Sequence, residues 1–359
     1  MEKLPPLEVF DKSKQLCDGI KIESVALNSL YYGRLQLIVP KALSISQLLK
    51  LKMERLDDTS FLRKLVKRIL FVCSYHGLAV FIKPLNVTAF FPTRTLGSSY
   101  LIVGNTRLVL VEQATARITS FVFGRDDSEL EKEIKMRKYF PETVQAKLVY
   151  VDVGQRIVTE ELLRGDFLTR LNTTKFDSKI TSFLAKNGEA VCQRNSNEAI
   201  AVIKNACRLM EISVKGLSID LVSGRLMSIS CANLSVSHGD AHRGNIIIEN
   251  GSFYFIDWEF SAVRFQYYDY FVFDLGLRTK SGIEDFNTVS FLCSIKKLEK
   301  IVGVSLDAST AYYHLITEEL VFRSELYQTA RDSQSLKMFS REIACKYLKM
   351  LGDTHDCPF

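Results

Sequence analysis

The sequence contains no Cys-x-x-Cys pair, few prolines and few histidines, and no apolar run long enough to cross a membrane. Its 8 cysteines lie far apart, which argues against a structural zinc site and is typical of a reducing compartment. With only 7 prolines and 18 glycines in 359 residues, collagen-like and low-complexity chains are excluded. The most apolar stretch, residues 69–82, is interrupted by Ser74, His76 and Gly77, and a spanning helix needs about 20 apolar residues.

The residues from Met1 to Pro6 lack the apolar core of a signal peptide. We therefore expect a soluble, cytoplasmic protein without a transmembrane segment. Hydrophobic residues make up 47% and charged residues 25%, which excludes a wholly disordered chain. The length suffices for two domains. A net charge of +6 suits anionic ligands such as phosphates, but it does not indicate nucleic acid as a partner.

The first 90 residues contain two segments, 50–56 and 61–70, in which apolar residues lie three and four positions apart with basic residues between them. This spacing predicts amphipathic helices with a solvated basic face. Peripheral contact with a membrane surface or with a partner is the alternative interpretation. These residues resemble no family, and we treat 1–92 as an N-terminal extension of unknown role.

From residue 98 the pattern changes to short apolar runs typical of strands. A tight turn at Gly104-Asn105 predicts a β-hairpin. A helix follows after possible capping residues and ends at Pro141. The expected strands are 98–103, 106–112, 117–123, 147–151 and 156–160, and the expected helix is 128–140. Together they predict a small lobe with an antiparallel sheet, over residues 93–163.

Residues 166–232 and 305–350 have helical character. We therefore assign residues 164–359 to a larger, mainly helical lobe. The predicted fold class is α+β, with two lobes and the N-terminal extension.

The most informative stretch is residues 237–259, SHGDAHRGNIIIENGSFYFIDWE. The dipeptide Asn250-Gly251 between two apolar runs is a strong hairpin signal. Because strands pair in register around a two-residue turn, this turn predicts that Asn245 lies opposite residues 255–257. Asn245 and Asp257 should then meet at one end of the hairpin, with Asp240 on the loop that enters it.

An amide and a carboxylate held together supply the oxygen ligands that Mg²⁺ prefers beside substrate phosphates. The neighbouring Asp240 could accept a hydroxyl proton, and the spacing Asp-x-x-x-x-Asn is that of the catalytic loop in phosphoryl-transfer enzymes. Alone, this spacing would more often mark polar turn residues. Its combination with the His-Gly-Asp entry and the Ile-Asp-Trp-Glu exit favours a catalytic site.

These residues, His238 to Asn245 and Ile256 to Glu259, resemble the aminoglycoside phosphotransferase/choline kinase-like family of the protein-kinase-like fold. Residues 265–271 are similar to a segment of members linked to bacterial surface-polysaccharide clusters. The resemblance implies ATP and Mg²⁺ as cofactors and a small-molecule or glycan acceptor. It also implies that Asp240 is the catalytic base, that Asn245 and Asp257 bind Mg²⁺, and that His238 braces the loop.

The family also has a Lys on the third strand, paired with a Glu on the next helix, and a hinge that contacts adenine. The resemblance places the Glu at Glu133 and the hinge at Glu160, Glu161 and Leu162. The Lys position falls near residues 119–120, which are Thr and Ser. Arg117 on the same strand could bind the phosphates instead, although Arg is a bidentate donor and not equivalent to Lys. A surface role for Arg117 is the equal alternative.

Four further side chains near the motif have open roles. Arg243 could neutralise charge on the transferred phosphoryl group, contact an anionic acceptor, or form a salt bridge that braces the loop. Glu259 could bind a second metal ion or acceptor hydroxyls. Asp269 and Asp274 are interpreted as caps of the helix that follows.

Three functions compete. The first is an ATP-dependent kinase acting on a hydroxyl of a sugar, an amino alcohol or an aminoglycoside-like acceptor. The missing Lys suggests the second, a catalytically weak or inactive kinase-like nucleotide-binding module. The third is a metallohydrolase, since His238, Asp240 and His242 alternate and could share one face of a strand.

Overall fold

The structure is a computed structural model. It describes residues 25–32, 37–40, 85–91, 99–103, 107–112, 115–122, 127–171, 175–212, 230–329 and 334–352. The chain divides into two compact units. One contains Glu2–Leu130 and Ala146–Arg164, and the other contains Glu131–Gln145 and Gly165–Phe359. The segments 50–56 and 61–70, the turn at 104–105 and the predicted boundary at residue 92 lie outside the described residues.

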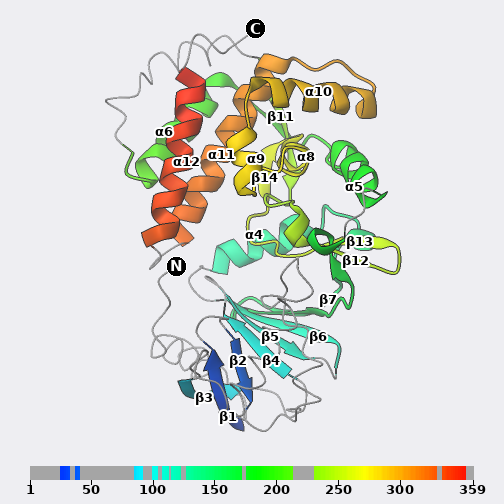
Figure 1. The fold of residues 1–359 in the computed structure, drawn as a ribbon, viewed down its shortest axis with the longest axis vertical. Coiled ribbons are helices and arrows are strands. Elements are labelled where there is room, and N and C mark those ends of the chain that lie inside the picture. Colours follow the sequence, from blue (N-terminus) through cyan, green and yellow to red (C-terminus); the bar gives the residue numbers. More distant parts are fainter. Residues whose placement is uncertain are drawn as a thin grey trace. The chain divides into compact units, whose positions relative to one another are not determined.

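The first unit is built on one antiparallel sheet, whose described strands follow the order β3-β1-β2-β4-β5-β6-β8-β7 (Figure 1). The strands are β1 (Val25–Tyr32), β2 (Leu37–Pro40), β3 (Leu85–Phe91), β4 (Ser99–Val103), β5 (Arg107–Glu112), β6 (Arg117–Val122), β7 (Leu148–Asp152) and β8 (Ile157–Glu161). The predicted pairing of β4 with β5 and of β5 with β6 is confirmed. The sheet also takes three strands from residues 25–91, a placement that the sequence did not indicate.

Helix α4 (Asp127–Arg137) follows β6 as expected, but it ends before the predicted Phe140. The physical reason is a side chain: the Gln145 amide nitrogen donates to the carbonyl oxygens of Arg137 at 3.2 Å and Phe140 at 2.9 Å. The Arg137 oxygen also accepts the Phe140 N–H at 3.0 Å, an i→i+3 bond of the kind that tightens the chain at a helix end. Pro141 instead precedes a short 3₁₀ turn, η2 (Glu142–Val144).

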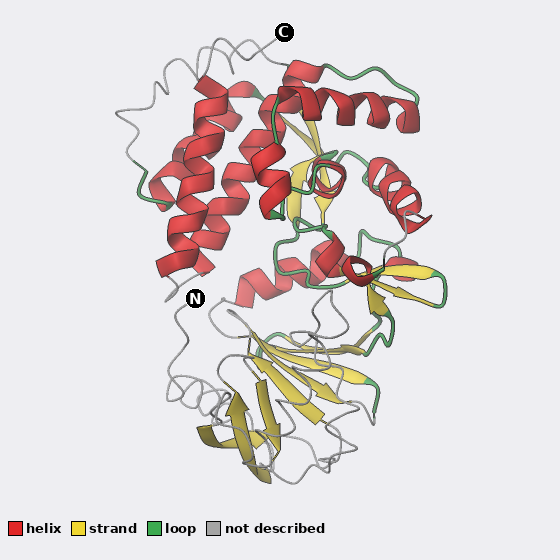
Figure 2. Cartoon of the chain, viewed as in Figure 1, coloured by secondary structure: helices red, strands yellow, loops and turns green. Residues whose placement is uncertain are grey.

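The second unit is mainly helical (Figure 2). Its longest helix, α11, is buried along most of its length and packs against α6 and α12. Asn195 begins α6 and Asn287 begins α10, each in a reciprocal capping box. The helices are α5 (Lys175–Lys186), α6 (Ser196–Leu209), α8 (Tyr268–Asp274), α9 (Lys280–Asp285), α10 (Thr288–Val302), α11 (Ala308–Thr329) and α12 (Gln334–Gly352).

Two small sheets lie within this unit and position the motif. One has the order β13-β12-β9 and the other the order β10-β11-β14, and all their pairings are antiparallel. Their strands are β9 (Asp166–Phe167), β10 (Cys192–Arg194), β11 (Ala232–Ser237), β12 (Ile246–Glu249), β13 (Ser252–Phe255) and β14 (Ala262–Phe265).

The helical character expected over residues 166–232 is found in α5 and α6, but the described residues also include the short strands β9 and β10. Gly188, at a φ of +114°, interrupts the helical pattern after α5, and β10 pairs with β11 before Asn195 starts α6. An antiparallel sheet followed by a mainly helical part confirms the α+β class.

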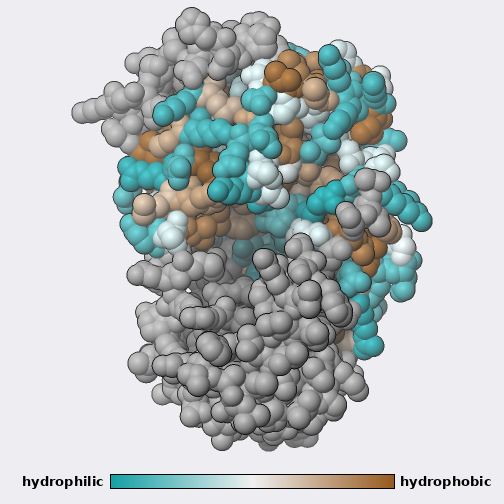
Figure 3. Space-filling view, in the orientation of Figure 1, coloured by the Kyte–Doolittle hydropathy of each residue, from teal (hydrophilic) through white to brown (hydrophobic). Residues whose placement is uncertain are grey.

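The described surface of the helical unit is chemically mixed. Figure 3 shows hydrophilic residues interspersed with smaller hydrophobic groups on the visible face. The exposed large hydrophobic residues include Val289, Val304 and Met338, which come from different parts of the chain. Within the described ranges, no helix combines the length and the apolar character that crossing a membrane requires.

Candidate active site

The hairpin at the centre of the motif has the predicted register. Ile246 of β12 lies opposite Phe255 of β13. Asn250 and Gly251 form the turn, with φ values of +50° and +78°. Positive φ at both positions is what a type I′ turn requires, and its twist matches that of the two strands.

Beyond the paired strands, the hairpin brings Asn245 and Asp257 to the same end. The Ile256 N–H donates to the Asn245 carbonyl oxygen at 3.0 Å, which extends the ladder by one step. Asp257 comes directly after it, is exposed, and has a φ of +63°. A non-glycine residue in the left-handed region is strained, and such strain clusters at functional sites.

The loop before the hairpin is anchored by a carboxylate from α8. Asp269, 7% exposed, accepts the N–H of His238 at 2.7 Å and of Gly239 at 3.0 Å. Burial raises the pKa of Asp269, while the bonds from Ser237, His238 and Gly239 oppose that rise. The interpretation of Asp269 as a helix cap is thus wrong, because its acceptor oxygens serve a loop some 30 residues earlier.

Asp274, at the end of α8, is not a cap of the next helix either. Its carboxylate accepts the Ser294 hydroxyl at 2.7 Å and the Lys297 ammonium at 3.2 Å. Both partners belong to α10, so Asp274 ties α8 to α10.

His238 is fully buried and holds the loop against the hairpin. Its Nε2 lies 2.9 Å from the Ile256 carbonyl oxygen, and its Nδ1 accepts the Asp240 N–H at 3.3 Å. The imidazole is therefore neutral with its proton on Nε2, the tautomer that both partners require. Burial lowers the pKa of His238 to about 3. These are the contacts expected of a brace.

The contacts of His238 also argue against the metallohydrolase. Residues 238–242 form a loop, so His238, Asp240 and His242 do not share a strand face. Both ring nitrogens of His238 are engaged by backbone groups, and a zinc ligand needs a nitrogen lone pair. His242 Nδ1 is likewise engaged, by the Gly244 N–H at 2.8 Å.

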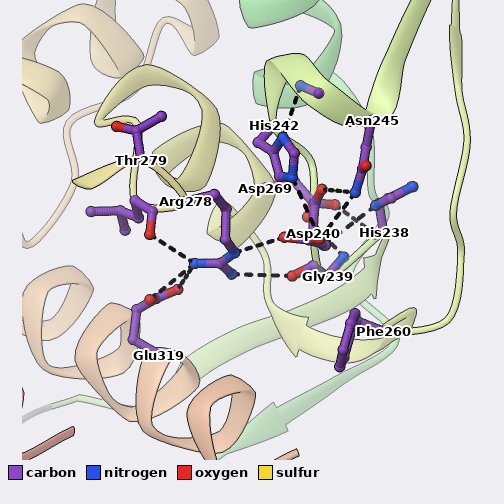
Figure 4. Close-up of polar contacts among 12 residues, drawn as sticks. His238, Gly239, Asp240, His242, Asn245, Phe260, Asp269, Arg278, Thr279 and Glu319 are labelled. Atoms are coloured by element: carbon purple, nitrogen blue, oxygen red, sulfur yellow. Dashed lines mark hydrogen bonds and ion pairs between the residues drawn. The ribbon is translucent and has the colours of Figure 1, made fainter. Parts of the chain in front are cut away.

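Asp240 lies at the centre of the polar contacts in Figure 4. Its Oδ1 accepts Arg278 Nε at 2.7 Å, and its Oδ2 accepts Asn245 Nδ2 at 3.0 Å. His242 Nε2 lies 3.7 Å from the same Oδ2. Burial, and to a smaller extent Arg278, lowers the pKa of His242, while the Asp240 carboxylate opposes this shift. His242 is therefore neutral at pH 7.

Asn245 and Asp257 fit the donor set of a hard cation. Asn245 is 9% exposed. Its amide nitrogen donates to the Asp240 carboxylate and to the Asp240 backbone oxygen, so the atom that could bind a metal ion is Oδ1. Asp257 contributes a carboxylate, and Mg²⁺ prefers such oxygen ligands. Within the described part of the chain, no three His, Cys, Asp or Glu side chains form a metal-binding group. The candidate site instead consists of the Asn245 amide and the Asp257 carboxylate.

Arg243 forms an ion pair with Asp177 of α5 and lies 5.8 Å from the centre of the Phe273 ring. This is the loop-bracing salt bridge that was one of its predicted roles. The side chain remains 43% exposed. Glu259 is half-buried beyond Asp257.

The residues predicted to bind the nucleotide lie partly in the sheet unit. Arg117 is exposed at the start of β6, opposite Glu112 of β5 and Glu161 of β8. Glu160 and Glu161 end β8, and Leu162 follows. Glu133 is 2% exposed on the part of α4 that belongs to the helical unit. At the expected Lys position, Thr119 Oγ1 lies 3.1 Å from Thr159 Oγ1.

Sequence reasoning missed Arg278 and Glu319. Arg278, between α8 and α9, binds Asp240 on one side and Glu319 of α11 on the other. Neither residue belongs to a local motif. Their only signal in the sequence is the type of residue, so the chain fold alone reveals their link to Asp240.

The buried histidines make the fold sensitive to acid. Burial lowers the pKa of His238 to about 3 and that of His314 to about 4, whereas an unfolded His titrates near pH ~6.5. As the pH falls from about 6.5 to 4, the unfolded chain takes up protons that the folded chain does not bind, so stability falls. Each such histidine contributes a slope of about 1.4 kcal/mol per pH unit.

His314 stacks on Phe265 outside the site and permits a test. The variant His314→Phe should lower the pH dependence of the unfolding free energy by about 1.4 kcal/mol per unit between about pH 4.5 and 6. Urea unfolding across this range measures it. An unchanged slope would contradict the assignment of a neutral, buried His314.

No family model matches the chain, and no curated protein does. Among solved structures, a choline/ethanolamine kinase family protein from Mesorhizobium loti is similar at 14% identity and a TM-score of 0.49, covering 72% of this chain and 89% of that chain. Choline kinase LicA from Streptococcus pneumoniae is similar at 16% identity and a TM-score of 0.42, with coverages of 72% and 92%.

The gentamicin complex of the aminoglycoside phosphotransferase APH(2")-IIa has 14% identity and a TM-score of 0.42, with coverages of 70% and 90%. These proteins come from the group that residues 238–259 resemble, and the likeness at such identities concerns the fold.

Proposed function

We propose that this protein is an ATP-dependent phosphotransferase that moves the γ-phosphate to a hydroxyl of a small molecule or glycan. The observation that carries the proposal is the grouping at the end of the β12–β13 hairpin. Asp240 and Asn245 are hydrogen bonded there, and Asp257 lies at the same end. This is the arrangement of base and metal-binding residues in phosphoryl-transfer enzymes.

In the proposed reaction, Asp240 accepts the proton of the acceptor hydroxyl. The hydroxyl oxygen forms a bond to the γ-phosphorus, and the bond to the β-phosphate oxygen breaks, which releases ADP. Asp240 suits this role because it is largely buried and fixed by two hydrogen bonds, which orient the carboxylate before the acceptor arrives.

Asn245 and Asp257 would hold Mg²⁺, which neutralises phosphate charge when bound. His238 fixes the backbone of the loop, and Arg243 braces it through Asp177. For the nucleotide we propose Arg117 as the phosphate-binding side chain, Glu133 as the carboxylate that pairs with the phosphate-binding cation, and residues 160–162 as the adenine-binding segment.

The second candidate is a nucleotide-binding module with little or no turnover. Thr119 and Ser120 stand where a phosphate-binding Lys is expected, and the Thr119 hydroxyl is already paired with Thr159. The intact group of Asp240, Asn245 and Asp257 favours the enzyme over this alternative.

One assay separates the two candidates. The full chain is incubated with Mg²⁺ and ATP, with and without a panel of sugars, amino alcohols and aminoglycosides, and the release of ADP is measured. We expect ADP release that depends on both Mg²⁺ and one acceptor class. Binding of Mg²⁺–ATP by calorimetry without release for any acceptor would favour the module, and failure to bind nucleotide would contradict both.

A further inference from the structure

Arg278 is a buried cation whose hydrogen-bonding capacity is fully used. Its side chain is 6% exposed. Nε donates to Asp240 Oδ1 at 2.7 Å, and Nη1 donates to both carboxylate oxygens of Glu319 at 2.8 and 3.0 Å. Nη2 donates to the Tyr268 hydroxyl at 2.7 Å and to the Gly239 carbonyl oxygen at 3.3 Å.

An aromatic contact also holds the guanidinium in place. Arg278 Cζ lies 3.6 Å from the centre of the Phe322 ring. Phe322 belongs to α11, the helix that also carries Glu319. Figure 4 shows Arg278 extended between Glu319 and Asp240. Turning toward a phosphate would break several charged hydrogen bonds in a buried setting, so Arg278 stays with Asp240.

Glu319 is the fixed end of this arrangement. It is fully buried, accepts the Tyr268 hydroxyl at 2.8 Å, and lies 3.4 Å from Arg323 Nη2. Burial alone would raise its pKa, but Arg278 and Arg323 outweigh burial, and the pKa of Glu319 is lowered. For Arg278, burial is likewise outweighed, chiefly by Glu319, and its pKa is raised. Both groups are therefore charged at neutral pH.

We propose that Arg278, held by Glu319, is a positioning residue that assigns separate roles to the two oxygens of Asp240. Oδ1 is tied to Arg278, and Oδ2 is the atom that accepts the proton of the acceptor hydroxyl. Oδ2 has Asn245 Nδ2 at 3.0 Å and the neutral His242 at 3.7 Å, so it faces the metal-binding side of the loop. The role of Oδ2 as the proton acceptor rests on the proposed function.

The closest conservative change is Arg278→Lys, which keeps the charge but cannot join Asp240 and Glu319 in the same geometry. We expect turnover to fall by about 10²-fold, the size expected when a reacting group is misplaced by about 1 Å. The affinity for Mg²⁺–ATP should be little changed, because Arg278 makes its contacts within the protein. The same variant should show a displaced Asp240 carboxylate in a crystal structure.

The control is Arg194→Lys. Arg194 is also largely buried and pairs with the adjacent glutamate of α11, Glu318, at 2.6 Å, away from the catalytic loop. It should keep turnover and the Asp240 conformation even if it lowers thermal stability. Equal losses of turnover in both variants, or an unmoved Asp240 in Arg278→Lys, would overturn the proposal.

Two further arms keep the test decisive. If Arg278→Lys does not fold, Glu319→Gln keeps the shape of the side chain while removing the charge that fixes Arg278, and it should move Asp240 and lower turnover in the same direction. If the wild-type chain binds Mg²⁺–ATP but transfers no phosphate, the proposed function fails. The crystallographic comparison of Asp240 then still supports or overturns the positioning role.

Discussion

Asp240→Asn is expected to lower phosphate transfer by about 10²- to 10⁴-fold while Mg²⁺–nucleotide binding persists, because it removes the proposed general base and leaves the proposed metal ligands in place. Asp257→Ala should behave differently. It removes the proposed carboxylate ligand at the end of the hairpin where Asn245 lies, so Mg²⁺-dependent nucleotide binding and turnover should be lost together.

The structure adds a second variant to this experiment. An Asn at position 240 can still accept Arg278 Nε, but its own amide would then face the amide of Asn245, which now donates to Asp240 Oδ2. Asp240→Ala avoids this donor–donor contact. Both variants should give the same separation of turnover from binding.

Calorimetry with Mg²⁺ and a non-hydrolysable nucleotide, together with ADP release, measures both quantities. Full turnover in either Asp240 variant, or loss of metal–nucleotide binding in both, would show that Asp240 is not the base. Retained Mg²⁺-dependent binding in Asp257→Ala would remove Asp257 from the metal site.

The parts of the site that the sequence predicted are those in which neighbouring residues determine the geometry. A two-residue Asn250-Gly251 turn permits one register, so the meeting of Asn245 with the residues before Asp257 follows from spacing alone. The pairing of β4 with β5 and β6 has the same origin, since short connections favour antiparallel neighbours.

The remaining contacts join residues that are far apart in the chain. From the sequence, Asp269 is expected to cap its helix, because an acidic residue at the start of a helix commonly has that role. Whether its oxygens serve that helix or a loop 31 residues earlier depends on how β11 and β14 pair. Arg278 and Glu319 are more distant still, and no period or spacing connects them with Asp240. A single sequence does not determine such contacts before the fold is known.

Gly239→Ala is expected to destabilise the protein far more than a methyl group added at any other position of this loop. Gly239 has a φ of +83°, and a Cβ there would lie 2.0 Å from the Phe260 carbonyl oxygen, a backbone atom that cannot turn aside. Its N–H donates to Asp269 and its carbonyl oxygen accepts Arg278, so a shift of this residue disturbs both the bond that holds the loop to α8 and the Arg278 side chain that holds Asp240. We expect a loss of about 4 kcal/mol or more in unfolding free energy, and turnover should fall as well.

Gly251→Ala supplies the matched control, because Gly251 has a similar φ of +78° but no atom within 4 Å of the added Cβ. It should cost only the strain of the left-handed conformation, about 1–2 kcal/mol. The difference between the two variants, measured by urea unfolding, isolates the clash with Phe260 from the backbone strain that both share. Equal unfolding free energies would mean that the loop yields at Phe260. The close approach of Gly239 would then not be what holds the Asp240 backbone in place.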